Sequence, residues 1–279
     1  MEIIKDKEFG GERPLYGLHD AHLQNVVIHV GESSIKESGN ITAENCRFEG
    51  KYVFWETDGF SVTDCHFTES ARSSLWYSRN CRMLNCRVEA PKLFRRMDGI
   101  YVENTDFPNG EQYLWDCKNI VLKNVTIDNC DYAFMHSENI RIDHYRQNGN
   151  YAFQYARNVE IHNAVINSKD ALWEAENVTV YDSYITGEYL GWNSKNITFI
   201  NCTIESLQGM CYMENVVMKN CKLLNTTLAF EKSTVDAEIV TKIDSVTNPV
   251  SGVIKSKGID EIILDEELTD VTKTRFETI

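Results

Sequence analysis

A repeat of 19 to 21 residues runs through the chain and constrains its fold more than any other feature. Its anchor position is held by asparagine, aspartate or glycine, at Asp20, Asn40, Gly59, Asn80, Gly99, Asn119, Asn139, Asn158, Asn177, Asn196 and Asn215. Five residues after each anchor stands Asn or Asp in ten repeats, and His144 in the other. Such regular spacing indicates a stack of repeated structural units.

The residues one and three positions after an anchor are mostly apolar, as in Ile41/Ala43 and Val178/Val180. This alternation of period two is typical of short strands with one buried face, and the helical period of 3.6 is absent. A coil of about 19 residues cannot bury a core alone, so it must stack on its neighbours at roughly 4.8 Å per coil. The pattern predicts an all-β, single-stranded parallel β-helix of about 11–12 coils, right-handed by the crossover rule.

No linker divides the chain, so we expect residues 1–279 to form a single β-helix domain. Residues 1–19 are predicted to form an N-terminal cap over the first open coil, because an uncovered coil exposes strand edges. Residues 20–264 would contain the coils, and residues 265–279 an acidic tail.

Composition limits the partners and the compartment. The chain has 28 basic and 42 acidic residues, a net charge of −14 that disfavours nucleic acid. It has no apolar run of about 18 residues, so no membrane span is expected. The nine cysteines form no Cys-x-x-Cys pair, and Cys46, Cys65, Cys86, Cys202 and Cys221 all stand six residues after an anchor. Together with the lack of an apolar leader, this predicts a buried row of reduced thiols in a cytoplasmic protein.

Several segments between the repeats are also distinctive, namely Glu89–Arg96, Gly187–Asn196, Glu205–Tyr212 and Phe230–Ile239. With the asparagine ladders, they make the sequence resemble an uncharacterised bacterial family labelled as a domain of unknown function. That resemblance covers nearly the whole chain and implies a pectin-lyase-like right-handed β-helix. It carries no substrate or catalytic residue, so function has to be argued from a site.

One column of the repeat calls for a functional explanation. The position five residues before the anchor is apolar in ten of eleven repeats and is predicted to point inward. The next position contains all five tryptophans together with Lys36, Arg95 and Gln154, which would be costly to bury, so we interpret it as an outward ridge. The predicted ligand-binding residues are Trp55, Trp76, Arg95, Trp115, Trp173, Glu174 and Trp192. Aromatic rings of this kind suit sugar rings, so the expected partner is an oligosaccharide or sugar derivative.

The column that follows the ridge places Arg96, Asp116, His136 and Tyr155 on consecutive coils, and these are the candidate catalytic residues. An imidazole, as in His136, titrates near neutral pH, and beside a cation such as Arg96 it can act as the base of a lyase that acts on a uronate. A glycosidase needs two carboxyl groups about 5–9.5 Å apart, whereas carboxylates three coils apart in this column are separated by roughly 14 Å. Pairing of a column carboxylate with Asp170 or Glu188 stays open.

Three other readings are weighed against this hypothesis. The polar column is also typical of a solvated face with ion pairs between coils, and an inward column would make the tryptophans core residues. The ridge also fits a non-catalytic scaffold that docks a partner or forms a homo-oligomer. Whether the protein is an enzyme stays undecided, and no cofactor or metal is expected, because His66, His144 and His162 stand at different coil positions.

Overall fold

The computed structural model describes residues 1–279 as two compact units, Met1–Arg146 and Gln147–Ile279. The secondary structure consists of strands and turns, and the fold is a parallel β-solenoid of about 15 turns. The all-β parallel β-helix predicted from the repeat is confirmed, but it has about 15 turns and not the 11–12 coils that were predicted. The chain has no helix of the length and apolar character that a bilayer crossing requires.

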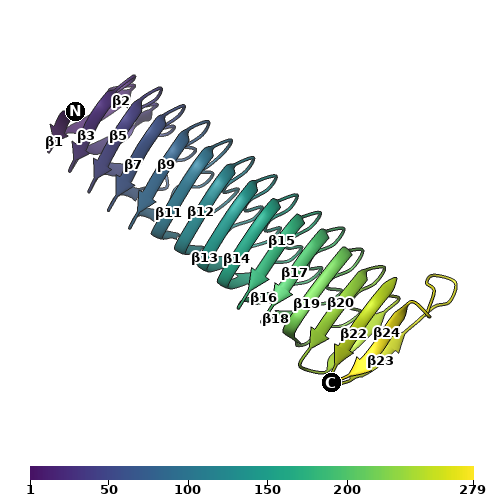
Figure 1. Ribbon diagram of the computed structural model, residues 1–279. Helices are drawn as coiled ribbons and strands as arrows, with labels where there is room; N and C mark the ends of the chain where they lie inside the picture. Colours follow the sequence, from purple (N-terminus) through teal and green to yellow (C-terminus); the bar gives the residue numbers. More distant parts are fainter. The chain divides into compact units, whose positions relative to one another are not determined.

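The first unit contains two rows of parallel strands. Figure 1 shows strands β3, β5, β7 and β9 of one row side by side. Strands β1, β3, β5, β7, β9, β11 and β12 pair in one row, and β2, β4, β6, β8, β10 and β11 in the other. The bounds are β1 (Glu2–Lys5), β2 (Glu8–Glu12), β3 (His19–Gln24), β4 (Val27–Glu32), β5 (Gly39–Glu44), β6 (Arg47–Phe48), β7 (Asp58–Thr63), β8 (His66–Phe67), β9 (Arg79–Leu84), β10 (Arg87–Val88), β11 (Asp98–Phe107) and β12 (Lys118–Ile127). Strand β13 (Glu138–Asn148) begins in this unit and ends in the second.

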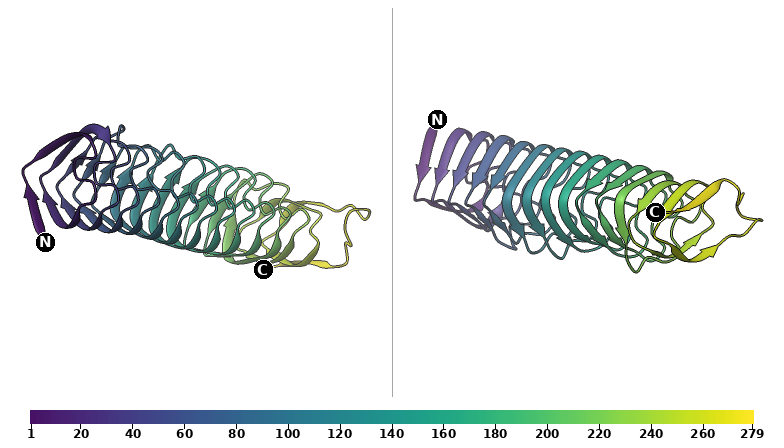
Figure 2. Two further views of the ribbon diagram at one scale, coloured as in Figure 1. Left: turned by 90° about the horizontal axis from the view of Figure 1, so that it is seen from above. Right: turned by 60° about the horizontal axis from the view of Figure 1, so that its bottom comes forward.

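The second unit repeats this arrangement. Strands β14, β15, β17, β19, β20, β22 and β24 pair in parallel, and β14, β16, β18 and β19 form a further row. The bounds are β14 (Arg157–Asn167), β15 (Glu176–Tyr181), β16 (Tyr184–Thr186), β17 (Lys195–Ile200), β18 (Thr203–Glu205), β19 (Glu214–Leu223), β20 (Thr234–Ile239), β21 (Ile243–Thr247), β22 (Ser251–Ser256), β23 (Ile259–Ile263) and β24 (Thr274–Thr278). Strands β21 and β23 pair separately. Figure 2 shows the coils of each unit as loops laid one on the next.

Left-handed residues turn the chain at the corners of each coil. Asn25 and Asn45 have φ of 53° and 50°, a region that asparagine tolerates better than most residues. Their side chains also connect the coils, because Asn45 Nδ2 donates a hydrogen bond of 2.8 Å to Asn25 Oδ1. The second unit has the same contact between Asn220 and Asn201, at 2.9 Å. The polar residues of the repeat therefore stabilise both the corners and the stacking.

The interior of the coils is apolar and contains the cysteines. Phe48 and Phe67 stack in neighbouring coils with ring centroids 4.7 Å apart. All nine cysteines are free and buried, and Cys46 N donates to the Cys65 sulfur at 3.4 Å. Burial raises the pKa of Cys117 to about 12. The thiols are thus core residues that form no disulfide.

Both ends of the chain contain strands that pair with neighbouring strands. Residues 1–19 contain β1 and β2, which pair in parallel with β3 and β4 and so build a coil of their own. Residues 265–279 contain β24, which pairs in parallel with β22. Both segments continue the solenoid because a new strand can satisfy its backbone hydrogen bonds on the edge of the preceding coil.

Candidate functional site

The tryptophans lie at the surface boundary of the coils and are half-buried, while the residues just before them are buried. Phe54, Leu75 and Leu114, which precede Trp55, Trp76 and Trp115, are at most 1% exposed. The column as a whole is not uniformly outward, because Gln154 and Cys211 are buried at the same position. The tryptophans therefore lie outside the core but have much of their surface covered.

In the first unit the rings gather into one cluster around Trp55. The Trp55 and Trp76 centroids are 5.3 Å apart, and the Trp55 and Tyr77 centroids 5.2 Å apart. Tyr77 is 38% exposed, so it carries the solvent-facing part of the cluster. Sequence reasoning did not assign Tyr77 to the site, although a tyrosine directly after a ridge tryptophan was the available signal.

Arg95 fills the gap between Trp76 and Trp115. Its guanidinium carbon lies 4.4 Å from the Trp76 ring and 4.6 Å from the Trp115 ring. Burial lowers the pKa of Arg95, and Nη2 donates to Gln112 Oε1 at 3.1 Å. The guanidinium thereby covers part of the surface of both indoles.

The indole N–H groups are also used within the protein. Trp76 Nε1 donates to the Lys92 carbonyl at 2.6 Å, and Trp115 Nε1 donates to the Tyr132 carbonyl at 2.5 Å. In the second unit Trp192 Nε1 donates to the Gln208 carbonyl at 3.0 Å. Each of these tryptophans holds the corner of the following coil, which is a structural role that accounts for part of the column.

Three of the four candidate catalytic residues come together in the first unit. Arg96 N donates to the Trp115 carbonyl and Asp116 N to the Met135 carbonyl, so the corners of Arg96, Asp116 and His136 follow one another in the stack. All three have φ between 50° and 56°, and all three are exposed. Arg96 lies 3.8 Å from Asp116, and its guanidinium lies 5.9 Å from the Tyr77 ring. Exposed cationic and acidic groups thus stand beside the aromatic cluster.

Tyr155, the fourth candidate, belongs to the second unit together with Trp173, Glu174 and Trp192. Tyr155 N donates to the Trp173 carbonyl, and Glu174 N to the Trp192 carbonyl. Rings surround Trp192, whose centroid is 6.4 Å from Trp173, 5.4 Å from Tyr189 and 5.2 Å from Tyr212. Each unit therefore has its own aromatic cluster, and the predicted quartet is divided between the units.

The carboxylates do not form an evident catalytic pair. Glu56 forms an ion pair with Lys36 at 3.1 Å and stands three coils before Asp116. In the second unit Asp170 is only 6% exposed, and burial, with a further contribution from Glu188, raises its pKa. Among these carboxylates, Asp170 is the one that is buried.

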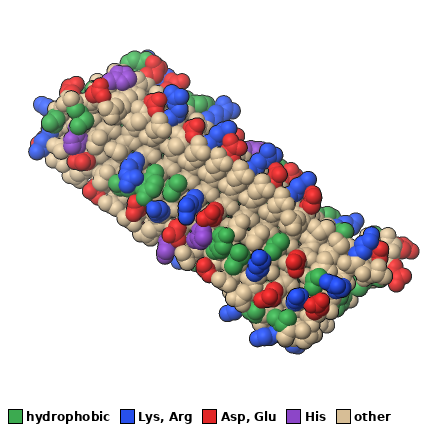
Figure 3. All heavy atoms as spheres, viewed as in Figure 1, with side chains coloured by type: hydrophobic (Ala, Val, Ile, Leu, Met, Phe, Trp, Pro, Cys, Tyr) green, Lys and Arg blue, Asp and Glu red, His purple; other side chains and the backbone are tan.

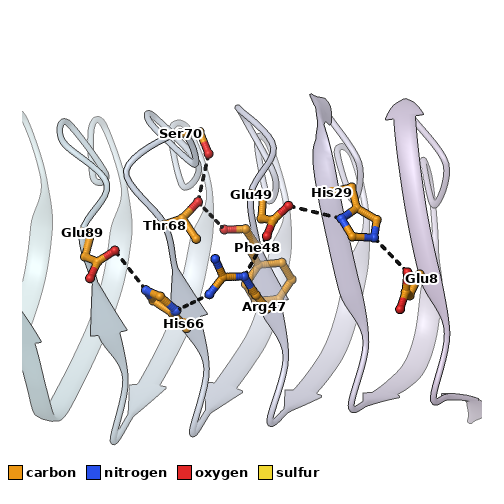
Figure 4. A network of polar contacts seen from close by, with 9 residues as sticks. All are labelled: Glu8, His29, Arg47, Phe48, Glu49, His66, Thr68, Ser70 and Glu89. Atoms are coloured by element: carbon orange, nitrogen blue, oxygen red, sulfur yellow. Dashed lines mark hydrogen bonds and ion pairs between the residues drawn. The ribbon is translucent and has the colours of Figure 1, made fainter.

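Another polar row, on β2, β4, β6 and β8, is saturated by its own contacts (Figure 4). His29 lies 2.9 Å from Glu8 and 3.2 Å from Glu49, while His66 lies 2.8 Å from Arg47. The hydrogen bonds to Glu8 and Glu49 raise the pKa of His29. No group of three or more His, Cys, Asp or Glu side chains has the geometry to hold a metal ion.

Comparison with known proteins finds solved structures that are similar to this chain. No curated protein matches the chain. Solved structures similar to it include the A-module of the Azotobacter vinelandii mannuronan C-5 epimerase AlgE4, 11% identical over 99% of this chain and 90% of that one, with a TM-score of 0.34. The Streptococcus pneumoniae surface adhesin PfbA is 10% identical over 95% and 85% of the two chains, with a TM-score of 0.38.

A third similar structure is the plasmid-mediated fluoroquinolone resistance protein QnrB1, 10% identical over 80% of this chain and 94% of that one, with a TM-score of 0.27. At these identities the likeness concerns the fold alone. The family assignment covers nearly every residue and agrees with the resemblance noted from the repeats. The chain belongs to the family described as "Protein of unknown function (DUF3737)", which it matches over residues 2–277.

Proposed function

We propose that this protein binds an oligosaccharide at the corner of the first unit where Tyr77 and Arg96 meet. The observation that carries the proposal is the position of the exposed Arg96 guanidinium, 5.9 Å from the ring of the exposed Tyr77 and 3.8 Å from Asp116. Tyr77 supplies apolar ring surface with a polar edge, which matches the alternating apolar and hydroxyl surfaces of a sugar.

The charged groups complement this surface. The Arg96 side chain is 62% exposed, and its distance from Asp116 is longer than a hydrogen bond, so its N–H groups are available to a ligand oxygen. The Asp116 side chain is 43% exposed and supplies carboxylate acceptors for sugar hydroxyls. Trp55 and Trp76 contact the Tyr77 ring, which reduces the side-chain freedom that binding would otherwise restrict.

Carbohydrate processing is the stronger form of the proposal and assigns His136 as the base. His136 follows Asp116 in the stack, so a sugar bound by Arg96 and Asp116 would extend toward it. The proposal predicts that His136→Ala abolishes turnover and preserves binding. Full turnover by that variant would reject the catalytic assignment and leave the binding assignment in place.

The binding test is a titration of tryptophan fluorescence with neutral and uronic-acid oligosaccharides. All five tryptophans lie in the ridge column, and Trp55 and Trp76 contact Tyr77 directly. We expect a saturable change for one ligand class that Tyr77→Ala and Arg96→Gln each weaken. Arg47→Gln, which removes an exposed arginine from the β6 face, is the matched control and should retain the wild-type affinity.

Absence of any saturable change across the panel would reject the proposal. If the tryptophans were then shielded from iodide in an assembly that depends on protein concentration, the alternative scaffold function would be favoured. Analytical ultracentrifugation of Tyr77→Ala beside the wild type would show whether this corner is the contact surface of that assembly.

A further inference from the structure

The outer face of the sheet formed by β9, β11 and β12 carries a group of side chains that sequence analysis did not single out. Arg82 on β9 is in register with Tyr101 on β11, and Glu103 on β11 is in register with Lys123 on β12. Figure 3 shows basic and hydrophobic side chains together over this part of the first unit. The face is distinct from the corner proposed above, because these residues lie within strands and not at turns.

Two cations flank one aromatic ring on this face. The Arg82 guanidinium carbon lies 4.3 Å from the Tyr101 ring centroid, and Lys123 Nζ lies 5.7 Å from the same centroid. Arg82 and Lys123 are both exposed. The ring holds the two charged groups toward the same surface, which orders side chains that would otherwise be mobile.

Neither Arg82 nor Lys123 forms an ion pair, and this distinguishes them from neighbouring cations. Arg79 on β9 lies 3.1 Å from Asp58, and Lys118 on β12 lies 2.7 Å from Glu138. In a chain of net charge −14, carboxylates are abundant, so two unpaired cations on either side of one ring are a specific local feature. Their hydrogen-bond donors are free for a ligand.

One neighbouring carboxylate, that of Glu103, accepts a hydrogen bond from the tyrosine. Glu103 is in register with Lys123, yet its Oε2 accepts a hydrogen bond of 2.6 Å from the Tyr101 hydroxyl. The phenol thus keeps Glu103 from pairing with Lys123 within the sheet. The remaining lone pairs of the Glu103 carboxylate stay available to a ligand hydroxyl.

We propose that Arg82, Tyr101 and Lys123 form an anion site that binds the carboxylate groups of a short acidic oligosaccharide. Arg82 and Lys123 stand two coils apart, about 9.6 Å along the stack, so one ligand can place a carboxylate near each. Long polyanions are disfavoured by the net negative charge of the chain. The saccharide part of this ligand rests on the proposed function, whereas the anionic part rests on the sheet face alone.

The test is isothermal titration calorimetry of the full chain with trigalacturonate at low ionic strength, with neutral galactotriose as the matched ligand. We expect trigalacturonate to bind more tightly than galactotriose. Arg82→Gln and Lys123→Gln should each weaken trigalacturonate binding by about tenfold or more, because each removes a charge-assisted hydrogen bond. Arg79→Gln and Lys118→Gln remove the same charge from ion-paired positions of the same two strands and should leave the affinity within about twofold.

Equal weakening by all four variants would show a general electrostatic effect and overturn the inference, as would unchanged affinity in Arg82→Gln and Lys123→Gln. Lack of trigalacturonate binding would overturn it as well. The two proposals fail separately. If galactotriose changes the tryptophan fluorescence, Tyr77→Ala abolishes that change and the sheet-face variants have no effect, the corner site stands and the sheet-face site is rejected. If trigalacturonate affinity depends on Arg82 and not on Tyr77, the sheet-face site stands and the corner site is rejected.

Discussion

The guanidinium of Arg95 lies 4.4 Å from the ring centroid of Trp76, in the place where the ridge column has no tryptophan. With Trp115 on its other side at 4.6 Å, it joins aromatic side chains of different coils into one stack. The stack explains why a charged residue occupies a half-buried position of this column. It also means that the ridge stabilises the solenoid in addition to any binding function.

Replacement of Arg95 should therefore reduce stability. We expect Arg95→Ala to lower the free energy of unfolding by about 1–3 kcal/mol, because two cation–π contacts and the covered indole faces are lost together. Arg95→Lys retains the charge without the planar stacking and should recover part of that loss. Urea unfolding followed by circular dichroism measures both values. Wild-type stability in Arg95→Ala would show that the stack contributes nothing.

The asparagine corners allow a test of two contributions to the same position. Asn45→Ala removes the hydrogen bond to Asn25 and places a less tolerant residue at φ 50°, so we expect a loss of about 1–3 kcal/mol. Asn45→Gly loses the same hydrogen bond but accepts the left-handed backbone, so its loss should be smaller. Equal losses in chemical unfolding would mean that backbone conformation does not matter there.

The row in Figure 4 predicts a pH dependence of stability. Hydrogen bonds to Glu8 and then Glu49 raise the pKa of His29, so the folded state binds the proton more tightly than the unfolded state. The resulting stabilisation is complete below the unfolded pKa of about 6.5 and is lost as the pH rises through the higher folded value. The urea midpoint should therefore fall between about pH 6 and about pH 8, and His29→Gln should reduce that fall. His19→Gln, outside the row, is the control.

Asp170 gives a prediction of opposite sense. Burial first, and Glu188 in addition, raise the pKa of this carboxyl, so ionisation disfavours the folded state at neutral pH. We expect Asp170→Asn to stabilise the protein at pH 7 by about 1 kcal/mol. The gain should disappear below the unfolded pKa of about 3.9, where the Asp170 carboxyl is protonated in both the folded and the unfolded state. Thermal unfolding of Asp170→Asn and the wild type at pH 7 and below about pH 3.9 measures this difference. Destabilisation of the variant at pH 7 would contradict the prediction.

The sequence by itself determined the fold, because the solenoid is built from local rules. Asn45 is a good left-handed corner residue wherever it stands, and the alternation of Ile41 and Ala43 specifies a half-buried strand from neighbours in the chain alone. Since every coil obeys the same rules, the repeat also predicted that Cys46 and Cys65 would align in the interior. The repeat does not predict the strands β1 and β24, because residues 1–19 and 265–279 lack the anchors. These strands pair in parallel with the edges of neighbouring coils.

Only the tertiary structure decided which surface residues act together. The ridge column could be listed from the sequence, but the insertion of Arg95 between Trp76 and Trp115 depends on side-chain conformation across coils. The same holds for Arg82 and Lys123, which are 41 positions apart in the sequence: strand register places Arg82 beside Tyr101, and the Lys123 side chain reaches the same ring from the register position of Glu103. Pairing of charges between coils also depends on side-chain conformation, since Arg79 is in register with both Asp58 and Asp98 and forms its ion pair with Asp58. The repeat predicts the position of a residue within its coil, whereas its side-chain contacts depend on the conformations of neighbouring side chains in the folded protein.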